Sequence, residues 1–331
     1  MNQPPLERIA ALGAGRMGRG IAIVFAYAGH PVTLVDLKTR ADGAADALRD
    51  AAMRDIAAQL DALSAAGLFA TSETPAILRR IDFAPAAAAA EAMARADVLF
   101  EGVPEVLAAK HQALASASRA ARPDAIIAST TSTILVDDLA GHVARPERFL
   151  NAHWLNPAYL IPLVELSPGA GTDAAVLARL KALLERIGKV PVVCAAAPGY
   201  IVPRIQALAM NEAARLVEAG VASAEDIDKA TRYGFGFRFA VLGLLEFTDW
   251  GGGDILYYAS RYLAGALGDQ RFAAPAIIDR NMQEGRIGLG SGRGFYDYQG
   301  IDVAAYRQQR IGELVALLRH LGLARPPVTA D

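Results

Sequence analysis

His153, Asn156 and Glu165 stand in one short stretch, residues 153–165, that is otherwise almost entirely apolar. A carboxylate bound to one nitrogen of a histidine fixes the tautomer of the ring and favours its charged form. The other nitrogen can then exchange a proton with a substrate hydroxyl. The stretch by itself also fits a buried histidine that is satisfied by a backbone carbonyl, with Glu165 on a solvated face.

Two short strands are needed to bring the pair together. Residues 149–152 are predicted to form a strand that leads into His153, and Asn156-Pro157 ends it. Residues 163–166 are predicted to form a second strand before Ser167-Pro-Gly. If these strands fold back on each other, Glu165 lies beside the imidazole of His153. We therefore expect a His-Glu acid/base dyad.

A glycine-rich turn near the start of the chain predicts a second kind of chemistry. Gly13, Gly15 and Gly18 stand between an apolar strand, residues 8–12, and a helix of small and apolar residues, 21–28. The first glycine can make the tight turn, the second lets backbone amides approach a pyrophosphate, and the third lets helix and strand pack closely. The helix N-terminus then favours the anion. A purely structural glycine turn is the alternative.

The next predicted strand, residues 31–36, ends in Asp36, about twenty residues after the turn, as in dinucleotide-binding folds. Asp36 would accept hydrogen bonds from the adenosine ribose and repel a 2'-phosphate, so NAD is favoured over NADP. Lys38 and Arg40 weaken that preference slightly, and a surface aspartate is the alternative. A long helical pattern, residues 39–66, follows.

Polar residues also follow the next two predicted strands, 96–100 and 124–129. Glu105 and Lys110 come after the first, at the edge where parallel sheets bind ligands, and could face the nicotinamide ribose. Charges at a solvated helix start are the equally plausible alternative. Four hydroxyls, residues 130–133, come after the second strand. One of them should cap the helix 134–140, and we assign that role to Ser132 or Thr133. In the functional interpretation, a spare Ser132 hydroxyl reaches into the cleft.

The pattern changes at residues 195–199, after a helix at 172–187 and a strand at 189–193. We predict an NAD-binding Rossmann-type α/β domain over residues 1–195 and an all-helical substrate and dimerisation domain over 196–331. The expected helices of the second domain include residues 203–219, 227–233, 242–250, 254–264, 274–284 and 303–320. They are too apolar for a small isolated bundle, so we expect a homodimer, a tightly packed monomer being the alternative.

Composition excludes several classes of protein. The chain of 331 residues has a formal net charge of -2, which gives no broad basic field for nucleic acid. The single cysteine, Cys194, cannot form an internal disulfide, which suits a reducing compartment, and the cytoplasm is expected. Residues 1–7 are not a signal-peptide pattern, and no apolar run is long enough for a membrane anchor. We expect no bound metal.

Together these motifs resemble the L-3-hydroxyacyl-CoA dehydrogenase family over nearly the whole chain. They are Gly13-x-Gly15-x-x-Gly18, Asp36, Val103-Pro-Glu105, Lys110, the hydroxyl cluster 129–133, His153-x-x-Asn156-Pro157, Glu165, Pro198-Gly-Tyr-Ile-Val202, Asn211-Glu-Ala213 and Gly292-Arg-Gly-Phe-Tyr-Asp-Tyr298.

The resemblance implies a role for each matching residue. His153 would take the proton of the substrate's 3-hydroxyl as hydride leaves C3 for NAD, and Glu165 would orient it. Ser132 and Asn156 would position the hydroxyl or the nicotinamide. The residues implied to hold the dinucleotide are Gly13, Gly15, Arg16, Met17, Gly18, Asp36, Glu105, Lys110 and Ser132.

Two departures from the acyl-CoA enzymes bear on the substrate. Pro203 stands where those enzymes have asparagine after Pro-Gly-Phe-Ile-Val, so Gln206 is a candidate replacement in the substrate site. On the helix 39–66, which in those enzymes offers basic residues to the CoA phosphates, Arg49 and Arg54 alternate with aspartates. The stretch 153–165 is also similar to the CoA-free branch, which includes L-gulonate 3-dehydrogenase (lambda-crystallin), carnitine 3-dehydrogenase and a pyridine-ring dehydrogenase.

The leading hypothesis is NAD-dependent oxidation of a 3-hydroxyacyl substrate to the 3-keto product, as in fatty acid metabolism, with (S)-3-hydroxybutyryl-CoA as the first candidate. A dehydrogenase of a CoA-free 3-hydroxy acid or alcohol is the alternative. A non-catalytic NAD-binding protein is the second alternative.

Overall fold

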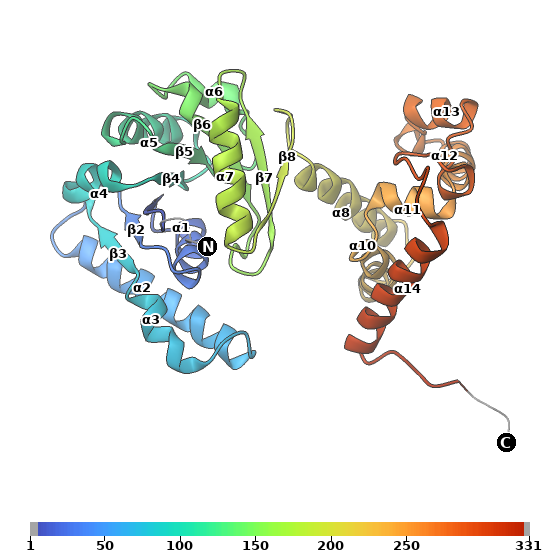
Figure 1. Cartoon of the computed structure of the whole chain (residues 1–331), viewed down its shortest axis with the longest axis horizontal. Coiled ribbons are helices and arrows are strands. Elements are labelled where there is room, and N and C mark those ends of the chain that lie inside the picture. Colours follow the sequence, from blue (N-terminus) through green and yellow to red (C-terminus); the bar gives the residue numbers. More distant parts are fainter. Residues whose placement is uncertain (1–5, 328–331) are drawn as a thin grey trace. The chain divides into compact units, whose positions relative to one another are not determined.

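The structure is a computed structural model that describes residues 6–327. The chain divides into two compact units, Met1–Ala209 and Met210–Asp331 (Figure 1). Residues 1–5, which belong to the stretch judged not to be a signal peptide, lie outside the described part.

The first unit is built on an eight-stranded sheet with the strand order β3-β2-β1-β4-β5-β6-β7-β8. All neighbouring strands are parallel except β6 and β7, which are antiparallel. The strands are β1 (Ile9–Leu12), β2 (Val32–Val35), β3 (Ile81–Ala84), β4 (Val98–Glu101), β5 (Ile126–Ser129), β6 (Phe149–Trp154), β7 (Leu163–Pro168) and β8 (Val190–Val193). The order of the first six strands is that of dinucleotide-binding folds, so the expected α/β Rossmann architecture is confirmed.

Each face of the sheet has its own apolar core, because successive side chains of a strand point to opposite faces. In β1, Ile9 and Ala11 belong to one core, and Ala10 and Leu12 to the other. The helices whose apolar residues join the first core are α1 (Arg16–Tyr27), α2 (Ala44–Ala65), α3 (Thr74–Leu78) and α7 (Ala174–Arg186). Those of the second core are α4 (Ala89–Arg95), α5 (Leu107–Ala120) and α6 (Val136–Ala140). The near-continuous apolar strands are therefore explained by burial on both sides.

Two predicted helices begin later than expected. Helix α2 starts at Ala44 and not at residue 39, because Gly43 has the left-handed φ of 75°. The residues just before it are held differently: the backbone N-H of Lys38 and the side chain of Arg40 bind the Asp36 carboxylate. Helix α6 starts at Val136 and not at 134. In both places the residues expected in the first helical turn instead make polar contacts at the carboxyl ends of the strands, with Asp36 before α2 and with Glu105 and Thr131 before α6.

The second unit is helical, and within its described residues the strand-like pairing is limited to isolated bridges that involve Arg293. Its helices are α8 (Val202–Glu218, which begins in the first unit), α9 (Ala224–Ala230), α10 (Phe237–Phe239), α11 (Leu244–Gly251), α12 (Gly253–Leu267), α13 (Ala276–Gln283) and α14 (Val303–His320). A π-helical segment, Thr231–Gly236, follows α9. Ser223 caps α9, accepting a hydrogen bond from the N-H of Asp226 at 3.1 Å. The expected helical second part is confirmed.

No helix between residues 6 and 327 combines the length and the apolar character needed to span a membrane.

Candidate active site

His153 and Glu165 face each other across the one antiparallel strand pair of the sheet. β6 and β7 pair with His153 opposite Glu165, as the two predicted strands require. The imidazole Nδ1 lies 2.8 Å from Glu165 Oε2, and both side chains are buried. The partner of the histidine is therefore a carboxylate and not a backbone carbonyl.

The second oxygen of Glu165 is also bound. Oε1 accepts hydrogen bonds from the backbone N-H groups of Ile201 at 2.9 Å and Val202 at 2.8 Å. These donors satisfy the second oxygen of the buried carboxylate and fix it in place. Since a carboxylate only accepts hydrogen bonds, Nδ1 of His153 carries a proton, and Nε2 is left free to accept one from a substrate.

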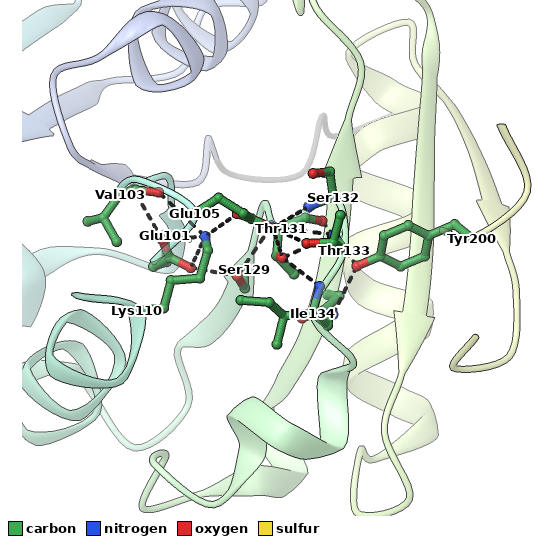
Figure 2. Close-up of polar contacts among 11 residues, drawn as sticks. Glu101, Val103, Glu105, Lys110, Ser129, Thr131, Ser132, Thr133, Ile134 and Tyr200 are labelled. Carbon is green, nitrogen blue, oxygen red and sulfur yellow. Dashed lines mark hydrogen bonds and ion pairs between the residues drawn. The ribbon is translucent and has the colours of Figure 1, made fainter. Parts of the chain in front are cut away.

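Glu101 forms a buried ion pair that sequence reasoning missed. It ends β4 and is fully buried, and Lys110 Nζ on α5 lies 3.1 Å from its Oε1. Ser129 Oγ at the end of β5 donates to Glu101 Oε2 at 2.5 Å, and the Val103 N-H donates to Oε1 at 2.8 Å (Figure 2). One feature of the sequence could have predicted this ion pair: Glu101 ends an apolar strand, and Lys110 follows on the next helix.

Lys110 also lies 3.1 Å from Glu105 Oε2, so its buried ammonium stands between two carboxylates. Lys110 is fully buried and does not itself line the cleft. It acts on the cleft only through its ion pair with Glu105. Burial alone would raise the pKa of Glu105, but the hydrogen bond from Thr131 and the charge of Lys110 outweigh it, and that pKa is lowered. Glu105 therefore presents a partly exposed carboxylate to the cleft.

The hydroxyl cluster after β5 folds around Glu105. Its Oε1 accepts hydrogen bonds from the hydroxyls of Thr131 and Thr133 and from the N-H of Ser132. The capping assignment to Ser132 or Thr133 is wrong. Helix α6 begins after Leu135, and no side chain caps it. In the turn before it, the Thr131 hydroxyl accepts a hydrogen bond from the N-H of Ile134 at 3.1 Å. Ser132 is left to face the cleft, whereas Thr133 is turned to Glu105.

A cavity of about 370 Å³ brings many of the candidate residues together. His153 lies in its wall, and the other expected residues that line it are Arg16, Met17, Glu105, Ser132, Asn156 and Gln206. Pro203 lines it too, so the departure from the family asparagine lies in the cleft itself. Glu165 lies behind His153, and Lys110 behind Glu105.

The glycine turn fits the expected dinucleotide. Gly13 has a φ of +107°, and a Cβ there would lie 3.1 Å from the Gly102 carbonyl oxygen. A Cβ on Gly18 would lie 2.0 Å from the Gly13 carbonyl oxygen, so only glycine allows this contact of turn and helix. Gly15 has open space beside it and caps α1 without a side chain. The first amides of α1 are therefore accessible to an anion.

Asp36 lies at the end of β2 and is buried. Arg40 forms an ion pair with its carboxylate, with Nη2 3.2 Å from Oδ1. A cavity of about 930 Å³ opens beside these residues, lined by Leu37, Lys38, Met93 and Val103 among others. Val103 lines both this cavity and the one at His153. Val103 follows β4, beside the point where the strand order reverses between β1 and β4, which is where open α/β sheets bind dinucleotides.

Comparison with known proteins shows the family to which the chain belongs. The model of the 3-hydroxyacyl-CoA dehydrogenase NAD-binding domain matches residues 8–197, and that of the C-terminal domain of the same enzymes matches residues 199–298.

Individual relatives carry different substrate names. A 5-formyl-3-hydroxy-2-methylpyridine 4-carboxylate 5-dehydrogenase of Mesorhizobium japonicum is 31% identical over 96% of this chain and 98% of its own length. A probable 3-hydroxybutyryl-CoA dehydrogenase of Bacillus subtilis is 30% identical over 89% of this chain and 98% of its own. The crystal structure of a 3-hydroxyacyl-CoA dehydrogenase from Archaeoglobus fulgidus superposes with a TM-score of 0.75 at 33% identity, covering 96% of this chain and 100% of that one.

Proposed function

The chain belongs to the 3-hydroxyacyl-CoA dehydrogenase family, an NAD-dependent oxidoreductase family acting on CH-OH groups, and from this premise we propose its substrate and the roles of its residues. The substrate we propose first is a short 3-hydroxyacyl-CoA such as (S)-3-hydroxybutyryl-CoA, oxidised to the 3-keto product. The observation that carries the proposal is the His153-Glu165 contact of 2.8 Å in the wall of the cleft.

His153 acts as the general base. Its Nε2 accepts the proton of the substrate hydroxyl, while Nδ1 donates to Glu165. The imidazolium that forms is balanced by the buried carboxylate, which stays in place because Ile201 and Val202 hold its other oxygen. When bound, NAD supplies the acceptor for the hydride that leaves the substrate carbon.

The remaining cleft residues bind and orient. Ser132 and Asn156 donate to the substrate hydroxyl or the carboxamide of the nicotinamide, and Glu105 accepts from the adjacent ribose. The hydrogen bond from Thr131 and the charge of Lys110 together lower the pKa of Glu105. The turn Gly13–Gly18 with Arg16 and Met17 holds the pyrophosphate, and Asp36 accepts from the adenosine ribose. Gln206 contacts the substrate beside Pro203.

A CoA-free 3-hydroxy acid or ring alcohol is the second candidate, and α2 favours it. Arg49 is 2.9 Å from Asp46 and 3.0 Å from Asp50, and so is already neutralised by its neighbours. On α1, Arg19 pairs with Asp55 of α2 at 3.3 Å. Arg49 is thus paired within its own helix, and a paired guanidinium attracts the phosphates of CoA weakly. The pyridine-substrate relative also points to this branch.

The test measures reduction of NAD by the purified protein with (S)-3-hydroxybutyryl-CoA, with free 3-hydroxybutyrate, L-gulonate and carnitine, and with a pyridine-ring alcohol. The first proposal expects kcat/KM to be highest for the thioester by at least about tenfold, about 1.4 kcal/mol of transition-state binding. Turnover of CoA-free compounds alone would overturn it in favour of the second candidate. NAD binding with no turnover of any compound would contradict both.

The mechanism has its own test. His153→Ala should lower kcat by about 10²- to 10⁴-fold for whichever substrate is used, and Glu165→Gln should lower kcat while the protein still binds NAD. Unchanged kcat in His153→Ala would exclude the proposed base regardless of the substrate.

A further inference from the structure

The ring of Tyr200 lies flat against the catalytic histidine. The centroids of the Tyr200 and His153 rings are 5.1 Å apart and their planes differ by 5°. This offset parallel arrangement is a favourable geometry for two aromatic rings. A neighbour in this position resists tipping of the imidazole, because any rotation out of its plane brings the two rings into collision.

The hydroxyl of Tyr200 is anchored at the turn that holds Glu105. It accepts a hydrogen bond from Asn151 Nδ2 at 3.0 Å and donates to the carbonyl of Thr131 at 3.0 Å (Figure 2). Asn151 is fully buried and also donates to the Ile134 carbonyl at 3.0 Å. Burial raises the pKa of the Tyr200 hydroxyl above its ordinary value, so the group stays protonated and keeps its donor role.

The backbone at Tyr200 positions the donors that bind Glu165, the second member of the dyad. Its φ of 45° lies in the left-handed region, which side chains other than those of glycine, asparagine and aspartate rarely adopt. The next two N-H groups, of Ile201 and Val202, both donate to Glu165 Oε1. Such a conformation is unfavourable for a bulky residue, so the surrounding contacts must hold Tyr200 in it. Strained residues of this kind are frequent at functional sites.

We propose that Tyr200 is a positioning residue for the acid/base pair: its ring fixes the plane of the His153 imidazole, and its left-handed turn aims two backbone donors at Glu165. The hydroxyl bonds to Asn151 and Thr131 hold the ring in place. The proposal rests on the proposed role of His153 as the base. It extends that role to a residue that does not line the cavity at His153.

Two substitutions separate the parts of this device. Tyr200→Phe keeps the ring but removes its anchor, and we expect kcat to fall about tenfold. Tyr200→Leu removes the ring, and kcat should fall about 100-fold, the size of effect that a small misplacement of a reacting group can produce. In both variants kcat should fall by a larger factor than the KM for NAD rises, because Tyr200 lines neither cavity and reaches Glu105 only through the Thr131 turn.

The stack also has a spectroscopic signature that does not depend on turnover. The chain has five histidines, so their ring carbon and proton signals can be followed by NMR after selective labelling. The signal that disappears in His153→Asn belongs to His153. In the wild type, the Tyr200 ring current should displace it upfield. The displacement should persist in Tyr200→Phe and be lost in Tyr200→Leu.

Ser118→Ala is the matched control. The Ser118 hydroxyl is buried in the same unit and accepts a hydrogen bond from the Ala144 N-H at 2.6 Å, so its loss weakens the fold without touching the dyad. Its kcat and its His153 signal should equal those of the wild type.

The proposal is overturned if both Tyr200 variants keep wild-type kcat, or if the His153 signal is the same in Tyr200→Leu as in the wild type. Should Tyr200→Leu not fold, Tyr200→Phe decides alone, through its kcat relative to Ser118→Ala. Full activity of His153→Ala would refute the proposed base instead, and the NMR comparison would still report whether the rings stack.

Discussion

The two units of this chain keep their apolar side chains in different places. The α/β unit has a buried core on each face of its sheet. Within residues 210–327 the buried apolar side chains are those of Ile227, Leu242, Ile278, Leu289 and Tyr298. The same part of the chain exposes many large ones, including Met210, Ile255, Tyr258 and Tyr262.

The difference sets the candidate site apart from the exposed apolar surface. The candidate residues for proton transfer and cofactor binding lie within residues 1–209, on a sheet that is packed from both sides. The helical unit instead offers an apolar groove of about 640 Å³ lined by residues such as Phe239, Leu244, Phe247, Ile255 and Leu256. Exposed apolar surface of this kind is typical of an interaction site. We propose that a second copy of the chain covers it, giving the expected homodimer.

The largest effect should come from the α/β unit. His153→Ala removes the general base, and kcat should fall by about 10²- to 10⁴-fold, the usual contribution of such a group. Steady-state kinetics measures this, with NAD binding as a check on the fold. His142→Ala is the control, because His142 lies on the same unit but pairs with His111 away from the cleft. Equal losses in the two variants would contradict the assignment.

The buried ion pair of the α/β unit should give the next effect. Lys110→Met leaves the Glu101 carboxylate buried without its cation, so the free energy of unfolding should fall by about 3–5 kcal/mol. Denaturant titration measures it. Lys181→Met on α7 breaks an exposed pair with Glu185 and should cost under about 1 kcal/mol. A similar loss of stability in both variants would contradict this prediction. It would mean that water reaches the Glu101 carboxylate or that the carboxylate takes up a proton.

A smaller effect is expected at the surface of the helical unit. Ile255→Asp puts a charge into the apolar groove, and the dissociation constant of the dimer should rise about 30-fold, equivalent to about 2 kcal/mol. Sedimentation over a range of protein concentrations measures it. Leu68→Asp is a matched control, since Leu68 is 53% exposed and Ile255 62%, but Leu68 lies on the α/β unit. A wild-type chain that stays monomeric at all concentrations would refute the interface.

The smallest effect compares equivalent helix caps in the two units. Asp173 accepts from the Ala175 N-H at the start of α7, and Asp302 from those of Ala304 and Ala305 at the start of α14. Replacement of either by Ala should cost about 1 kcal/mol. The two tryptophans can report the units separately, Trp154 in the first and Trp250 in the second. Asp173→Ala should shift only the Trp154 transition and Asp302→Ala only the Trp250 transition. Coincident shifts would show that the units unfold together.

Sequence patterns predicted the parts of the fold that depend on local periodicity. The strands β1, β4 and β5 are nearly continuous apolar runs, and the glycine turn could be predicted from its place between a strand and a helix. The His153-Glu165 contact also follows from the pattern, because two strands with a short connection place it directly. The expected roles of these residues stay proposals.

Long-range polar contacts could not be read from the same patterns. The assignment of the cap to Ser132 or Thr133 failed because α6 begins two residues later than predicted and because Glu105, far away in sequence, takes the Thr133 hydroxyl. The burial of Lys110 depends on Glu101 at the end of a different element. No periodicity shows that Tyr200 has a left-handed backbone or that its hydroxyl meets Asn151.

The antiparallel pair β6-β7 also bears on the order in which this site forms. The dyad joins residues twelve positions apart, whereas Glu101 and Ser129 are 28 apart and Tyr200 and Thr131 are 69 apart. Because the entropy of closing a loop grows with its length, the hairpin contact is the easiest of the three to form during folding. We therefore expect the contact between His153 and Glu165 to form as a local event, and the ring of Tyr200 to join it from a distant part of the chain.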